Sequence, residues 1–173
     1  MMSCSKIVVF LLFLAFMSGP ISCGKPISKK VFEDGVDMLL GEITRDDLFL
    51  EFPDWYENYS EYKPDSTIIN ALSEPHPDLN IEIFMGTWCS DSRREVPRFF
   101  KTLDESNFAD NDQIRLWAVD KNKSLESGLT EEKNILNVAT FIFYRNEKEI
   151  GRIIEQPDHG NIESDILSII KGT

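Results

Sequence analysis

The sequence has little cysteine and histidine. Its 173 residues include three cysteines and two histidines. A structural zinc site needs four ligands, usually brought together as closely spaced pairs. His76 instead lies between two prolines, and His159 lies in a polar turn far along the chain. The sequence therefore predicts no metal site and no Cys-His pair for acyl transfer, and nothing in it indicates a cofactor.

Basic residues are also scarce. Lysine and arginine number 18 against 30 acidic residues, which gives a net charge of -12. Nucleic acids and anionic lipids bind basic surfaces, so neither is expected as a partner of the folded part. A chain of this length can bury most of its apolar surface in one domain without disulfides or metals.

Long hydrophobic runs are absent except near the N-terminus. There Lys6 precedes an apolar run, residues 7–17, and small residues follow it up to Cys23. The run is too short to favour a membrane span, which needs roughly 20 apolar residues. A basic start, a short apolar core and small residues are typical of a secretory signal peptide. We therefore expect residues 1–23 to be a signal peptide and the protein to be exported to the cell envelope or periplasm.

Cys23 resembles the lipidated cysteine of bacterial lipoproteins. Ser22 fits that pattern, whereas Pro20 stands where a leucine is usual. The alternative is ordinary cleavage, for instance after Gly24, which gives a soluble exported protein. Either route removes Cys4, so the mature chain holds Cys89 and at most a lipid-blocked Cys23. It cannot be a disulfide-stapled scaffold.

Residues 25–78 are expected to form a helical extension. Apolar residues at three-to-four spacing between residues 31 and 40 predict a helix that stops at Gly41. A capping box at residues 44–47 and Asp65 predict two more helix starts. Five aromatic residues share one helical face, either to pack the extension onto the domain, which we favour, or to grip a ligand: Phe52, Trp55, Tyr56, Tyr59 and Tyr62.

From residue 79 the chain alternates between strand and helix patterns. The predicted order is strand, helix, strand, short helix, strand, strand and helix, at residues 80–85, 91–105, 114–119, 130–136, 140–144, 149–154 and 162–170. A turn at residues 145–148 makes the last two strands a hairpin. This order predicts an α/β fold with a mixed sheet and helices on both faces, in one domain over residues 79–173.

The pair Trp88-Cys89 lies where the first of these strands meets its helix. The first N–H groups of a helix lack internal partners and the helix dipole is positive there, so a thiolate is favoured. Four nearby charges compete: Arg93 and Arg94 favour the thiolate, whereas Asp91 and Glu95 oppose it.

With Pro97 eight residues after Cys89, this arrangement resembles the thioredoxin family over residues 79–171, and residues 86–97 are similar to those of exported bacterial thioredoxin-like proteins with a helical N-terminal extension. The resemblance implies a three-layer fold in which Cys89 is the nucleophile. It also implies that Trp88, Ala139 and Thr140 line a client groove beside it.

Three departures from that family narrow the chemistry. Ser92 replaces the resolving cysteine, Ala139 replaces a cis-proline, and Ile83 replaces a buried acid that helps to move protons. A cis bond before a residue other than proline costs about 2.5–4 kcal/mol, so we expect a trans bond before Ala139.

Two functions remain open. In the first, Cys89 attacks disulfides of client proteins and an external thiol resolves the mixed disulfide, while the Ser92 hydroxyl stabilises the thiolate; this would be a monothiol oxidoreductase or isomerase. In the second, the domain is a non-catalytic binding module, lipid-tethered through Cys23, that holds a partner.

We predict that Cys23→Ala moves the protein from the membrane fraction of a bacterial host to the soluble or unprocessed fraction, because lipidation needs the thiol. Intact-mass analysis of the wild type should then show a mature chain that begins at a lipid-modified Cys23. A soluble wild type that begins at Lys25 would establish ordinary cleavage instead, and an unprocessed wild type would contradict both routes.

Overall fold

The computed structural model describes residues 29–33 and 35–172. The predicted signal peptide, residues 1–23, and the predicted lipidation site Cys23 lie outside these residues. Within the described part of the chain, no helix is both long enough and apolar enough to cross a membrane.

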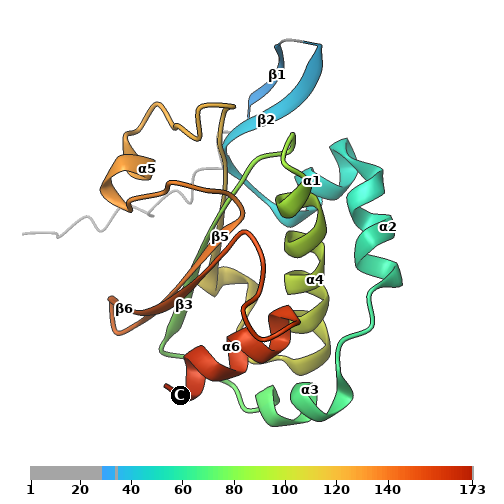
Figure 1. Ribbon diagram of the computed structural model, residues 1–173, viewed down its shortest axis with the longest axis vertical. Coiled ribbons are helices and arrows are strands. Elements are labelled where there is room, and N and C mark those ends of the chain that lie inside the picture. Colours follow the sequence, from blue (N-terminus) through green and yellow to red (C-terminus); the bar gives the residue numbers. More distant parts are fainter. Residues whose placement is uncertain (1–28, 34, 173) are drawn as a thin grey trace, which may run out of the picture.

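A six-stranded mixed sheet forms the centre of the fold (Figure 1). Its strands, in spatial order, are β1 (Lys29–Glu33), β2 (Val36–Ile43), β4 (Ile114–Ala118), β3 (Leu79–Met85), β5 (Thr140–Arg145) and β6 (Lys148–Ile154). β3 and β4 are parallel, and every other pair is antiparallel. The predicted fold class, an α/β fold with a mixed central sheet, is confirmed.

β3 is the central strand that leads to Cys89. It pairs with β4 along one edge and with β5 along the other. Most of its residues are buried, including Ile83, which occupies the place of the acid expected from the family. The last part of the strand, residues 83–85, is covered on both faces and is apolar throughout, whereas the polar Asn80 and Glu82 lie in its more exposed first part.

The helices divide unequally between the two faces of the sheet (Figure 1). One face carries all but one of them: α1 (Arg45–Glu51), α2 (Pro53–Glu61), α3 (Ser66–Leu72), α4 (Ser90–Ser106) and α6 (Ile162–Lys171). The other face carries the short α5 (Leu129–Glu132) and its flanking loops. A smaller apolar cluster fills the space beneath α5, around Phe84, Val138 and Ile142.

The helix predicted between residues 31 and 40 is wrong, because β1 and β2 form a hairpin there. Gly35, at φ 77°, lies at the turn in a conformation that suits glycine. The end of β2, residues 41–43, also pairs with β4. Met38 and Leu39 are both buried although they point to opposite faces. The three-to-four spacing therefore reflects a strand with two covered faces. The helices expected later in the extension are present as α1, α2 and α3.

Two carboxylates fasten the extension to the rest of the domain. Asp104 on α4 accepts hydrogen bonds from Arg45 Nη1, at 2.8 and 2.9 Å, and from the Tyr59 hydroxyl at 2.8 Å. The buried Glu163 on α6 accepts from the Tyr62 hydroxyl at 2.6 Å and from the Asp65 amide at 2.9 Å.

The aromatic face of α2 packs onto the domain, as we favoured. Trp55 is fully buried, and Phe52, Tyr59 and Tyr62 pack against the main core. Tyr56 is the exception, with 54% of its surface exposed.

We predict that Tyr59→Phe makes the alkaline loss of stability shallower. Burial and the hydrogen bond to Asp104 raise the pKa of Tyr59 to about 12. In the unfolded chain the phenol ionises near its ordinary pKa of about 10, so its contribution to stability is complete below about pH 10 and disappears as the pH rises towards 12.

Urea unfolding at a series of alkaline pH values measures this effect. Tyr56→Phe, which removes a hydroxyl from the exposed neighbouring ring, is the matched control and should keep the wild-type profile. Parallel profiles for Tyr59→Phe and the wild type would contradict the prediction.

Candidate active site

Cys89 is the N-cap residue of α4. Its carbonyl oxygen accepts the first helical hydrogen bond, from Arg93 N at 3.0 Å, and its backbone is extended. The side chain is half-buried and is the one free thiol of the described residues. The helix therefore presents its positive end beside an accessible sulfur, as the sequence predicts.

The turn that carries Cys89 depends on Gly86. The Gly86 carbonyl accepts from Cys89 N at 3.0 Å, which closes the turn. The Trp88 indole lies against Gly86, and a Cβ added there would come within 2.6 Å of Cε2 and 2.7 Å of Nε1. Trp88 Nε1 also donates to the Val119 carbonyl at 3.3 Å. Only glycine allows the indole to lie this close.

Ser92 braces the same turn from inside the helix. Its hydroxyl is fully buried and accepts a hydrogen bond from Gly86 N at 3.2 Å. The partner of this hydroxyl is thus a backbone amide, and no hydrogen bond to the Cys89 sulfur is formed in the described structure. The residue that replaces a resolving cysteine holds the strand-to-helix turn together.

The segment that begins β5 faces Cys89. The thiol donates to the Val138 carbonyl, with 3.0 Å between sulfur and oxygen. Ala139 and Thr140 are buried, and the Thr140 hydroxyl donates to the Asn137 carbonyl at 2.7 Å. The structure therefore brings the predicted residues Trp88, Ala139 and Thr140 to the surroundings of Cys89. Ala139 and Thr140 are buried there.

The peptide bond between Val138 and Ala139 is cis, so the expected trans bond is wrong. Both carbonyls of this dipeptide are engaged: Val138 O by the thiol, and Ala139 O by Glu155 N at 2.7 Å. Tertiary contacts from α4 and from the end of β6 thus determine the local conformation. The predicted trans bond rested on the intrinsic preference of a peptide bond before a residue other than proline, and that preference takes no account of tertiary contacts.

The charged residues near Cys89 pair with one another. Arg94 bonds Asp91 at 2.8 Å and the buried Glu95 at 2.5 Å. Arg93 pairs with Asp54 of α2 at 3.2 Å. The opposing charges seen in the sequence therefore largely cancel as local ion pairs.

Two exposed apolar side chains adjoin the segment that bonds the thiol, and sequence reasoning missed both. Leu136 precedes Val138 in the loop and is 79% exposed, and Ile154 lies opposite Thr140 on β6 and is 45% exposed. The Asn137 and Glu155 side chains, which adjoin these two residues, are hydrogen-bonded at 3.3 Å. In the sequence each of these residues stands beside polar neighbours and does not indicate an apolar surface. Only the pairing of β5 with β6 brings Ile154 next to the segment that follows Leu136.

The histidines take no part in this site. His159 bonds the buried Asp165 at 2.7 Å, and Asn161 caps α6 by accepting from Ser164 N, so this polar segment is a turn and a helix cap. Across the described ranges, no group of three or more His, Cys, Asp or Glu side chains could hold a metal ion.

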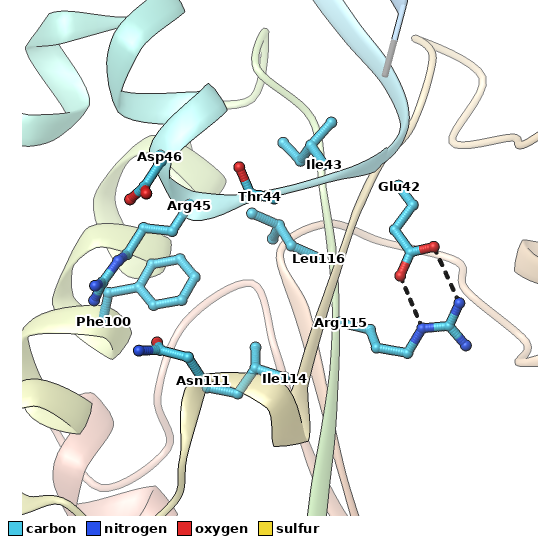
Figure 2. A pocket seen from close by; sticks show the side chains of 10 residues that line it. All are labelled: Glu42, Ile43, Thr44, Arg45, Asp46, Phe100, Asn111, Ile114, Arg115 and Leu116. Atoms are coloured by element: carbon cyan, nitrogen blue, oxygen red, sulfur yellow. Dashed lines mark hydrogen bonds and ion pairs between the residues drawn. The ribbon is translucent and has the colours of Figure 1, made fainter. Parts of the chain in front are cut away.

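A pocket at the other end of the sheet is separate from the thiol (Figure 2). It lies where β2 ends and β4 begins, whereas Cys89 follows the far end of β3. Its two arginines are engaged: Arg115 bonds both oxygens of Glu42, as the dashed lines show, and Arg45 bonds Asp104.

Comparison with solved structures supports the fold. A protein of unknown function from Pseudomonas aeruginosa aligns with a TM-score of 0.55 and 14% identity, over 71% of this chain and 85% of that one. An HIV epitope-scaffold aligns with a TM-score of 0.52 and 15% identity, over 76% of this chain and 99% of that one. No protein-family model and no curated protein matches the sequence. The likeness at these identities is one of fold.

We predict that Gly86→Ala displaces the Trp88 indole and changes the reactivity of Cys89. Nuclear magnetic resonance should show a shifted Trp88 indole N–H signal, and the rate of Cys89 alkylation should change. The protein should lose roughly 1–3 kcal/mol of stability, the usual cost of an overpacked site.

Gly151→Ala is the matched control, because its new Cβ would come within 3.0 Å of the Ile169 side chain, far from the thiol. It should lose stability while the Trp88 signal stays in place. An unchanged Trp88 signal in Gly86→Ala would contradict the positioning role of Gly86.

Proposed function

We propose that the protein is an exported monothiol thiol–disulfide exchange protein in which Cys89 attacks client disulfides. The observation that carries the proposal is the half-buried Cys89 at the positive end of α4, with no second thiol in the described chain. The predicted signal peptide and lipidation at Cys23 would place it in the cell envelope.

The exchange proceeds in three balanced steps. First, the Cys89 thiolate forms a bond to one sulfur of the client disulfide, and the other client sulfur leaves as a thiolate and takes up a proton. Second, an external thiolate attacks the Cys89 sulfur and expels the remaining client sulfur. Third, a second external thiolate frees Cys89. The client disulfide is thereby reduced to two thiols, and two external thiols are oxidised to one disulfide.

The apolar side chains beside Cys89 support a protein client. Leu136 is two residues before Val138, whose carbonyl bonds the thiol, and Ile154 pairs with Thr140, two residues after it. Exposed apolar surface next to a nucleophile favours a client whose disulfide lies in an apolar, extended or unfolded segment. For isomerisation, another thiolate of the same client attacks the client sulfur of the mixed disulfide, forms a new client disulfide and expels the Cys89 thiolate.

A non-catalytic binding module is the second candidate. The hydrogen bond from the thiol to Val138 O favours it, because this bond occupies the sulfur with a contact inside the protein. In that case the same apolar surface would hold a partner without exchange.

Alkylation of Cys89 as a function of pH separates the two candidates. We predict that at pH 7 the folded protein reacts with iodoacetamide at least several times faster than a free cysteine does, because the helix N-terminus stabilises the thiolate. Denatured protein is the control and should react like the free amino acid. A folded protein that reacts no faster would contradict exchange and favour the binding module.

Ser92→Cys provides a gain-of-function test of the same geometry. The new thiol would lie inside the turn at the position that now bonds Gly86. In the presence of dithiothreitol, we expect the variant to reduce insulin disulfides faster than the wild type does. Ser92→Ala should show no such gain. No gain in a folded Ser92→Cys protein would argue against a working exchange site.

A further inference from the structure

A cleft lined by arginines adjoins the thiol on the side of the extension. It lies between α2 and α4 and has a volume of about 320 Å³. Its wall on α4 contains Ser90, the residue after Cys89, two consecutive arginines, and a third arginine one turn further along. The residues that matter here are Asn58, Tyr62, Ser90, Arg93, Arg94 and Arg98.

The arginines are held in place by acids that leave part of each guanidinium free. Arg94 and Arg98 both bond Oε1 of the buried Glu95, and Arg93 uses Nη1 on Asp54. Arg98 also lies over the Tyr62 ring, 5.0 Å from its centre. Among the described contacts, Nη1 of Arg94 and both Nε and Nη2 of Arg93 and of Arg98 have no protein partner.

Directed donors, and not net charge, distinguish this cleft. Four acids surround the cleft and outnumber its three arginines. Three of them, Asp54, Asp91 and Glu95, are ion-pair partners of the arginines, and Glu61 lies in the wall. Fixed guanidinium N–H groups nevertheless match the two oxygens of a carboxylate. Hydrogen bonds to Glu95 and Asp91 raise the pKa of Arg94, which keeps it charged.

We propose that this cleft binds the carboxylate of a small external thiol and so delivers its sulfur to Cys89. This rests on the proposed function, and it identifies the second reactant as an anionic thiol. Ser90 lies in the cleft wall and its Cα is about 3.8 Å from that of Cys89, so an anion held there lies within the reach of a short thiol. The incoming thiolate forms a bond to the Cys89 sulfur, and the group already bound to that sulfur leaves with the electron pair.

The net charge of -12 makes this proposal sharply testable. Without a dedicated site, a strongly acidic protein favours cationic thiols over anionic ones. The cleft predicts the opposite order.

The experiment starts from the full chain carrying Cys4→Ser and Cys23→Ser, in which Cys89 is the one cysteine and has been converted to a neutral mixed disulfide with 2,2′-dipyridyl disulfide. Release of pyridine-2-thione is then followed after adding 3-mercaptopropionate, 2-mercaptoethanol or cysteamine. Each rate is divided by that of the same thiol with the pyridyl disulfide of a blocked cysteine, which removes intrinsic differences between the thiols.

We expect 3-mercaptopropionate to exceed cysteamine by about fivefold, the upper range for an exposed ion pair, and the preference to shrink with added salt. Arg93→Gln and Arg98→Gln should each abolish most of the preference. Arg115→Gln, which makes the same charge change at the far end of the sheet, is the matched control and should keep it.

Equal relative rates, or faster release by cysteamine, would overturn the anion site. Loss of the preference in Arg115→Gln as well would also overturn it, because the effect would then follow total charge. Failure of the proposed function is recognised separately, since an inert Cys89 would not form the pyridyl disulfide.

Discussion

The contact between the Trp88 indole and the bare Cα of Gly86 is the constraint on which the thiol site depends. It lets the indole reach the Val119 carbonyl, while the two backbone groups of Gly86 bond Ser92 and Cys89. The turn between β3 and α4 is thereby fixed at three points. A fixed turn presents the sulfur in one orientation, at the end of the helix where a negative charge is most favoured.

The opposite side of the thiol is built by a segment distant in sequence. The start of β5 supplies the Val138 carbonyl, and β6 supplies Ile154, so the surface around Cys89 exists only when the sheet is complete. This dependence on sheet pairing explains why a lone thiol can have a defined environment without a second cysteine. The residue that replaces that cysteine has a structural role in the turn.

The extension is part of the same construction. α2 lies along α4, and the carboxylates of Asp104 and Glu163 hold its aromatic side chains to α4 and α6. β2 adds a strand to the sheet beside β4. The arginine-lined cleft between α2 and α4 consequently has one wall from the extension and one from the helix that begins at Cys89. The extension and the domain that carries Cys89 therefore meet at this cleft.

The sequence by itself determined the local features. The strand order from residue 79, the position of Cys89 at a helix start and the β5–β6 hairpin follow from periodicity and turn residues, which act over a few positions. Two local predictions were wrong: residues 31–40 form the β1–β2 hairpin in place of a helix, and the bond before Ala139 is cis among contacts from Cys89 and the end of β6. Only the tertiary structure decided the carbonyl opposite the thiol and the arginine cleft. Each of these joins groups whose meeting depends on long-range packing, and no short stretch of sequence encodes such a distance.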